Sequence, residues 1–261
     1  MNWDALDLSI LGPAFVAGLI VLSTHVLLGQ QVLARGIIFI DLAIAQIAAL
    51  GVIAAEYAGI DEHSYLVQVA AAAAALIGGA VLNWSDGKWP DKQEALIGTS
   101  FALAATAAIL LLANNPHGGE HLKELLVGQI LWVSTTQIVT AALVSAGLLI
   151  AMWLRHGANK GFGFYAIFAI AITQSVQLVG VYLVFTSLIV PALATDHLTG
   201  RRRQLTAFAI GIAGYALGLT LSALLDLPSG AVIVWSLACC GVASRWLLPA
   251  PQGNAPAPAA H

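Results

Sequence analysis

One carboxylate, Asp41, stands inside an apolar run that extends from Gly36 to Glu56. An aspartate near the middle of a membrane helix costs about 2.5–3.5 kcal/mol on insertion scales, and such residues usually face a bundle interior or an ion pathway. Gln46 is the nearest polar side chain further along the run. At about 100° per residue the two side chains would point roughly 140° apart, so both reach one ion only after a local distortion. Asp41 and Gln46 are nevertheless the candidate metal ligands.

A structural role for Asp41 remains open. Asp41 follows Arg35 by six residues, which places it about 9 Å along a helix and away from the centre of a ~30 Å hydrocarbon core. At that depth, partial hydration or a hydrogen bond to a neighbouring helix would satisfy a buried structural acid. His25, in the first apolar segment, is interpreted as a packing residue.

The composition identifies a polytopic membrane protein. Hydrophobic residues make up 59% of the 261 residues and charged residues only 9%, whereas soluble domains carry roughly 25% charged residues. The few charges lie in the loops, so the net charge of -3 gives no reason to expect a nucleic-acid partner. Cys239 and Cys240 are adjacent, which suits neither a disulfide nor a metal site.

Apolar segments of the length that spans a membrane predict an all-α bundle of eight or nine transmembrane helices. The stretch 163–195 is too short for two full spans and too long for one, and its polar cluster is followed by Gly180, so we expect a broken helix there. Gln174 and Gln177 in this cluster are candidates for lining a translocation path, and they would equally satisfy a broken backbone. The predicted spans are 10–33, 37–56, 65–84, 95–113, 136–154, 163–178, 179–195, 206–224 and 230–248.

The basic residues predict the orientation in the cell membrane. With nine crossings, only Lys123 falls on the side opposite the other basic residues, and the positive-inside rule makes the basic side cytoplasmic. The N-terminus would lie outside, residues 1–248 would form one transmembrane domain, and the Pro/Ala-rich tail 249–261 would be a disordered cytoplasmic segment. The residues on the basic side are Arg35, Lys88, Lys92, Arg155, Lys160, Arg201, Arg202, Arg203 and Arg245.

The loops on the other side are acidic and contain His63, His117 and His121. These histidines are candidates for external metal capture, and the alternative is that the polar residues only keep the loops solvated. His117 and His121 would form a metal pair only on a helix, which Gly118 and Gly119 oppose.

Segment 120–134 contains only about ten consecutive apolar residues, too few for a crossing. It is either a short re-entrant helix or an amphipathic helix on the surface. Gln129, next to Gly128, is a further candidate for the translocation path.

A short polar connection at 194–204 joins two apolar segments. Pro191 is expected to kink the helix before it, Gly200 is a typical helix stop, and Arg201 to Arg203 would begin the next span. Such a basic triplet often serves only as an orientation anchor or a contact with membrane lipid.

Five motifs in order resemble the membrane permeases of the zinc/manganese/iron ABC importers. They are FID at 39–41 with the run to Gly51, EALIG at 94–98, LVGQIL at 126–131, TSLIVPALAT at 186–195 and LSALLDLPSG at 221–230. The resemblance implies a type II importer fold, a second permease copy, a cytoplasmic ABC ATPase dimer, an extracytoplasmic metal-binding protein and a divalent metal ion as substrate. It also implies that the connection contacts the ATPase, through Thr195, Asp196, His197, Leu198, Thr199, Gly200 and Arg201.

The chain departs from the family pattern at one position. Family members commonly carry a histidine four residues after the aspartate, and here that position is Ala45, so zinc specificity does not transfer. The sequence has no phosphate-binding glycine loop, so this subunit is expected to be no enzyme and to hold no cofactor, with ATP bound by the partner ATPase. The alternatives are a permease for a chelated metal, haem or cobalamin, a secondary transporter, and a membrane scaffold.

Overall fold

The computed structural model describes residues 7–61, 64–113, 115, 118–154 and 161–248, and these fold entirely into helices and connections. The expected all-α membrane bundle is confirmed. Eight helical segments within the described ranges are long and apolar enough to span a membrane, and α8 is shorter. The α-helices are α1 (Leu8–Arg35), α2 (Ile40–Tyr57), α3 (Tyr65–Lys88), α4 (Gln93–Leu112), α5 (Gly118–Val127), α6 (Thr135–Leu154), α7 (Phe162–Val179), α8 (Val181–Ala194), α9 (Gly200–Leu225) and α10 (Ser229–Leu247), with short 3-10 turns η2 (Pro90–Lys92) and η3 (Ile130–Trp132).

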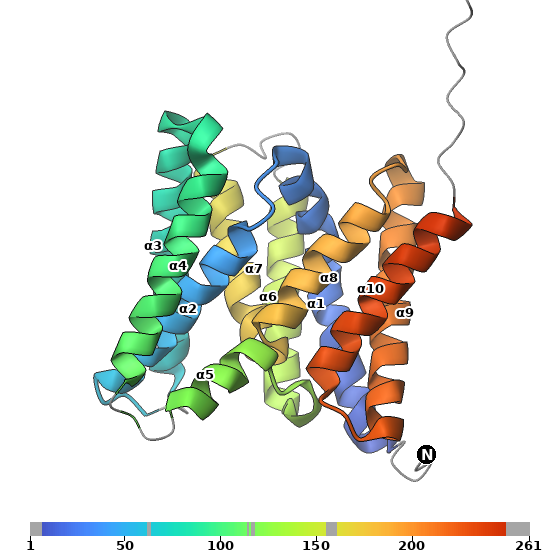
Figure 1. Ribbon diagram of the computed structural model, residues 1–261, viewed down its shortest axis with the longest axis horizontal. Helices are drawn as coiled ribbons and strands as arrows, with labels where there is room; N and C mark the ends of the chain where they lie inside the picture. The colour runs from blue at the N-terminus through green and yellow to red at the C-terminus, as the bar shows by residue number, and fades with distance from the viewer. Residues whose placement is uncertain (1–6, 62–63, 114, 116–117, 155–160, 249–261) are drawn as a thin grey trace, which may run out of the picture.

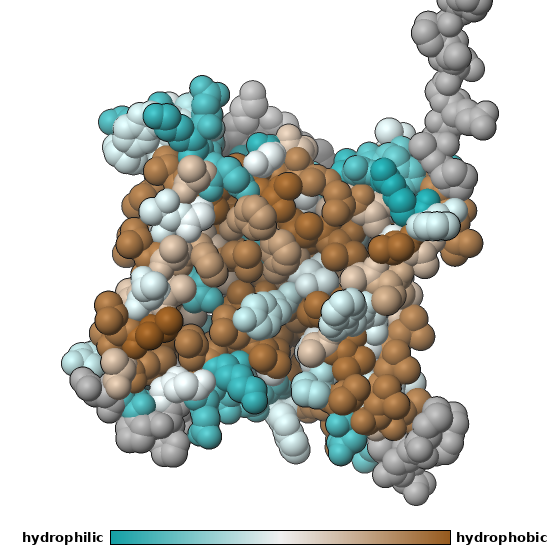
Figure 2. Space-filling view, viewed as in Figure 1, coloured by the Kyte–Doolittle hydropathy of each residue, from teal (hydrophilic) through white to brown (hydrophobic). Residues whose placement is uncertain are grey.

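The long helices run side by side from one end of the bundle to the other (Figure 1). Apolar side chains form a broad band around the middle of the visible face, and hydrophilic side chains gather at its two ends (Figure 2). A band of this kind matches a bilayer, in which side chains facing the lipid are apolar. The bundle is therefore a multi-pass membrane protein.

The predicted break in the stretch 163–195 lies at Gly180. α7 ends at Val179 and α8 begins at Val181, and Gly180 between them has φ 80° and ψ 163°. Glycine alone adopts this region of backbone space readily. α7 descends into the bundle and α8 returns towards the end from which α7 came (Figure 1).

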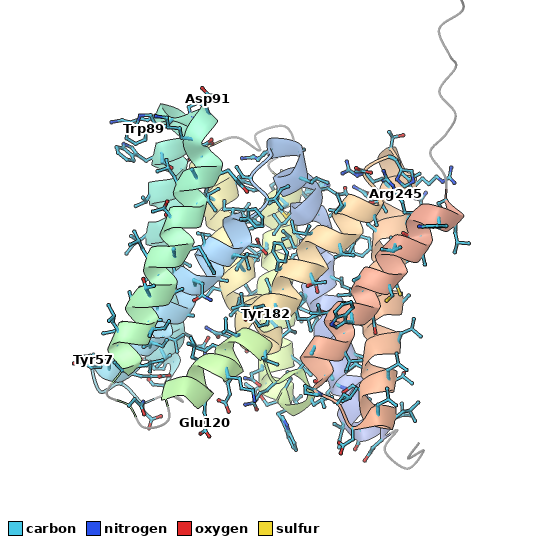
Figure 3. All side chains as sticks on the ribbon, viewed as in Figure 1. Tyr57, Trp89, Asp91, Glu120, Tyr182 and Arg245 are labelled. Carbon is cyan, nitrogen blue, oxygen red and sulfur yellow. The ribbon has the colours of Figure 1, made fainter. Side chains whose placement is uncertain are left out.

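With this return, the described chain starts at one end of the bundle and finishes at the opposite end. α1 begins at one end and α10 finishes at the other (Figure 1). Trp89, Asp91 and Arg245 mark one end, and Tyr57 and Glu120 mark the opposite end (Figure 3). We call the first the basic end, because it receives Lys88, Lys92, Arg201, Arg202 and Arg245, and the second the acidic end.

Close helix approach in the bundle depends on small residues. α2 packs against α3 and α4, and α1 packs against α8. A Cβ added to Gly29 on α1 would lie 2.0 Å from the Leu188 carbonyl oxygen of α8, and one added to Gly51 on α2 would lie 2.9 Å from the Ala70 carbonyl oxygen of α3. Backbone therefore meets backbone at these crossings, which leaves no room for a side chain.

Segment 120–134 forms a short helix that packs against the bundle. α5 runs across the bundle near the acidic end instead of along it (Figure 1), and it contacts α4, α7 and α8. Lys123 and Glu124 are exposed and Leu122, Leu125 and Leu126 are half-buried, so α5 is an amphipathic helix that also packs on the bundle, and it shares features of both alternatives. The expectation that Gly118 and Gly119 oppose a helix is wrong: α5 begins at Gly118 and continues through Gly119.

Candidate translocation site

A groove of about 450 Å³ opens on one face of the bundle. α2, α4, α5, α8 and α10 all contribute to its lining, which is mostly apolar. Tyr182 lies near the centre of this face (Figure 3). Polar groups reach the groove from Gln46, Tyr182 and Thr186.

Gln46 and Asp41 lie on different faces of α2. Gln46 lines the groove, while Asp41 is not among the lining residues. Asp41 is 1% exposed and lies in the first turn of α2. Neither of its carboxylate oxygens has a hydrogen-bond partner among the described residues. The structure therefore does not bring Asp41 and Gln46 together.

A second carboxylate, that of Glu94 in the first turn of α4, lies near the start of α2. The Phe39 backbone N–H donates a hydrogen bond to Glu94 Oε1 at 3.2 Å. Glu94 Oε2 is covered and has no partner in the described part of the chain. In the sequence, Glu94 was recognised only as the first residue of the EALIG motif and was given no role in the site.

Gln174, predicted to line the path, joins two helices. Its Nε2 donates to the Ala141 carbonyl oxygen and to Ser145 Oγ of α6, both at 3.0 Å. Gln177 is half-buried on α7, and Gln129 is exposed immediately before η3. None of the three glutamines lines the groove.

A backbone contact links α5 to the break between α7 and α8. Gly128, with φ 73°, follows α5, and a Cβ on Gly128 would lie 2.2 Å from the Val179 carbonyl carbon. A Cβ on Gly180 would lie 2.4 Å from the Gly128 nitrogen. The two glycines thus pack backbone against backbone.

The connection between α8 and α9 is a turn of five residues at the basic end, with no separate helix. Thr195 is buried and donates a 2.7 Å hydrogen bond to the Pro191 carbonyl oxygen, which lies within α8. Leu198 is also buried, while Asp196 and Thr199 are exposed.

The prediction that Gly200 stops a helix is wrong, since α9 begins at Gly200, whose φ is 56°. Arg201 and Arg202 are exposed in the first turn of α9 and Arg203 is half-buried. This turn therefore presents positive charge at the basic end.

Arg245 at the end of α10 holds the turn at 195–199 in place. Its guanidinium donates to Asp196 Oδ1 and lies 2.8 Å from His197 Nδ1, while His197 Nε2 lies 2.8 Å from the Leu248 carbonyl oxygen. Because arginine only donates, His197 accepts at Nδ1 and donates from Nε2. Partial burial raises the pKa of Asp196, but the hydrogen bond and charge of Arg245 outweigh it and hold that pKa below the usual 3.8. Asp196 is therefore ionised at neutral pH.

The external histidines cannot be placed as a group. His63 and His117 lie outside the described residues, and His121 belongs to α5. Among the residues that the structure describes, no three His, Cys, Asp or Glu side chains gather in a way that could hold a metal ion.

Comparisons with known proteins give a consistent result. The model of the ABC 3 transport family matches residues 7–157 and 159–247. The structure of PsaBC from Streptococcus pneumoniae in complex with Fab superposes with a TM-score of 0.73 at 19% identity, over 91% of this chain and 91% of that chain. No curated protein matches the sequence. The match to PsaBC shows the same fold.

Proposed function

Because the chain belongs to the ABC 3 transport family, in which it is a permease subunit, we propose that it carries a divalent transition-metal ion and that separate ATPase subunits drive it. The observation that carries the proposal is the groove on one face of the bundle, together with a buried carboxylate, with two unpartnered oxygens, on α2, one of the helices that line the groove. A charged group in such a place ordinarily serves an ion pathway.

The groove is half of the translocation path in this proposal. It lies on a face of the single bundle, and a second copy of the chain packed on that face would close it into a channel. Gln46 and Thr186 offer polar atoms along it. α5 crosses the bundle beside the groove at the acidic end (Figure 1), so it is placed to act as an outer gate.

The basic end faces the cytoplasm in this proposal, following the positive-inside rule. It presents the turn at 195–199 and the first turn of α9 to a cytoplasmic ATPase dimer. Arg245 holds this turn against α10, so a push on the turn would move α8 and α10 together. An extracytoplasmic metal-binding protein would deliver the ion at the acidic end. ATP is hydrolysed only in the partner.

The proposal requires that the chain does not transport alone. We expect vesicles that contain only this permease to take up no manganese, zinc or iron(II) above the leak of empty vesicles. Vesicles with the permease, its ATPase and its binding protein are expected to accumulate metal when supplied with ATP. Uptake by the permease alone along an ion gradient would instead identify a secondary transporter.

A further inference from the structure

We infer that the stacked rings of Phe39 and Phe185 form an apolar barrier that closes the groove to hydrated cations at its basic end. The inference rests on the proposed function, in which the groove is half of the translocation path, and adds to it an inner barrier opposite α5. A path open at both ends would let cations run down their gradients. Apolar constrictions block ions in membrane pores because they exclude water.

The two rings lie almost parallel to each other between two helices. Their centroids are 6.3 Å apart and their planes differ by 8°, within the range of an offset aromatic stack. Phe39 immediately precedes α2, and Phe185 lies in α8. The ring pair thus connects two of the helices that line the groove.

The ring pair lies at the basic margin of the groove. Phe185 is itself a lining residue. Leu42 and Gln46, which also line the groove, follow Phe39 by three and seven residues and therefore share its side of α2. α2 finishes at Tyr57, at the acidic end (Figure 3), so Phe39 lies on the basic side of both lining residues.

The lining of the groove changes from polar to apolar towards the basic end. Gln46 of α2 and Tyr182 of α8 supply polar atoms on the acidic side of the rings. Nearest the basic end, the lining residue of α2 is Leu42 and that of α4 is Phe101. Thr186, at the level of the rings, donates its hydroxyl proton to the Tyr182 carbonyl oxygen at 2.8 Å. A cation that moves towards the basic end therefore reaches apolar side chains, which cannot replace its water shell.

Backbone hydrogen bonds fix Phe39 from two helices. Its N–H donates to Glu94 Oε1 of α4 at 3.2 Å, and its carbonyl oxygen accepts from the Ala43 N–H of α2 at 3.3 Å. The residue is nevertheless 49% exposed. A second copy of the chain on this face would bring its own ring pair towards Phe39 and so extend the barrier across the path.

A thiol at position 46 reports whether a cation reaches the groove from the basic end. Gln46→Cys is introduced together with Cys239→Ala and Cys240→Ala, because both native cysteines are free and at least partly exposed. The nucleotide-free complex of permease and ATPase is placed in vesicles. A membrane-impermeant methanethiosulfonate with a quaternary ammonium group is then added on the ATPase side.

The thiol is expected to be protected while both rings are present. Phe39→Ala is expected to raise its rate of modification at least about tenfold, because the rings then no longer close the basic margin. The matched control is Phe162→Ala at the start of α7. It removes a ring from a residue that is 50% exposed and does not line the groove, and it is expected to leave the rate unchanged.

Modification of Gln46→Cys as fast as that of Asp91→Cys, an exposed position at the basic end, would show an open margin and overturn the inference. An unchanged rate in Phe39→Ala would also overturn it, since another part of the chain would then close the path. If Phe39→Ala does not assemble with the ATPase, Phe185→Ala removes the other ring and is expected to give the same increase. No increase there would count against the inference.

The barrier and the proposed function fail differently. Metal uptake by the complete wild-type complex, together with an unchanged modification rate in Phe39→Ala, would remove the barrier and leave the transport function standing. Absence of metal uptake by the wild-type complex, together with a raised modification rate in Phe39→Ala, would remove the function and leave the barrier.

Discussion

Gly180→Ala is expected to destabilise the folded permease by about 3 kcal/mol or more, and to abolish transport. The backbone at Gly180 has φ 80° and ψ 163°, a region that costs a residue with a side chain about 1–3 kcal/mol. The added Cβ would also lie 2.4 Å from the Gly128 nitrogen. Since the obstacle is backbone, it cannot turn aside as a side chain would. Thermal unfolding of the purified permease in detergent measures the loss.

Gly147→Ala is the matched control for this substitution. Gly147 lies inside α6, and a Cβ added there meets nothing within 4 Å. Alanine favours a helix over glycine by about 0.5–1 kcal/mol, so this variant is expected to be as stable as the wild type or more so. Equal stability of Gly180→Ala and Gly147→Ala would show that the break and its contact with Gly128 do not hold the fold together.

Reversing the charge of the first turn of α9 is expected to separate ATP hydrolysis from transport. The full change is Arg201→Glu, Arg202→Glu and Arg203→Glu. Arg201 and Arg202 are exposed, so a variant of these two alone avoids disturbing the half-buried Arg203. Like charges across an interface cost several kcal/mol. We therefore expect the metal transported per ATP to fall at least about tenfold, or the ATPase to dissociate from the permease. Both quantities are measured in vesicles that contain the complex.

Lys88→Glu with Lys92→Glu controls for the change in net charge. Both lysines lie near the connection between α3 and α4, at the same end of the bundle, and the double variant changes the charge by the same amount as the two-arginine variant. We expect transport per ATP to stay within about twofold of wild type. Equal loss in the two variants would mean that the charge of the whole end matters, and that the turn has no special role.

Hydropathy was sufficient to predict the spans because a bilayer demands a minimum apolar length. The segment 65–84 was predicted and α3 covers Tyr65–Lys88. The largest difference is at α9, predicted from 206 and observed from Gly200. Its first turn holds arginines and a glutamine, which form helices well but are not apolar, so hydropathy cannot detect it.

The arrangement of side chains could not be predicted from spacing along one helix. Glu94 reaches the start of α2, where its carboxylate accepts from the Phe39 N–H, because α2 packs on α4, a contact between segments more than fifty residues apart. Gln174 had the polarity expected of a path residue, yet its amide bonds to α6. Periodicity assigns a residue to a face of its helix, but only the packing of the bundle decides what that face meets.

Metal competition in the complete complex tests the central claim most directly. The permease, its ATPase and its binding protein are reconstituted in vesicles, and ATP-driven uptake of labelled manganese is measured while zinc or iron(II) is added. The account predicts ATP-dependent uptake that competing metal reduces, and its loss when Asp41→Asn replaces the wild-type chain. Uptake that stays at background for all three metals, or that is unchanged by Asp41→Asn, would contradict the account.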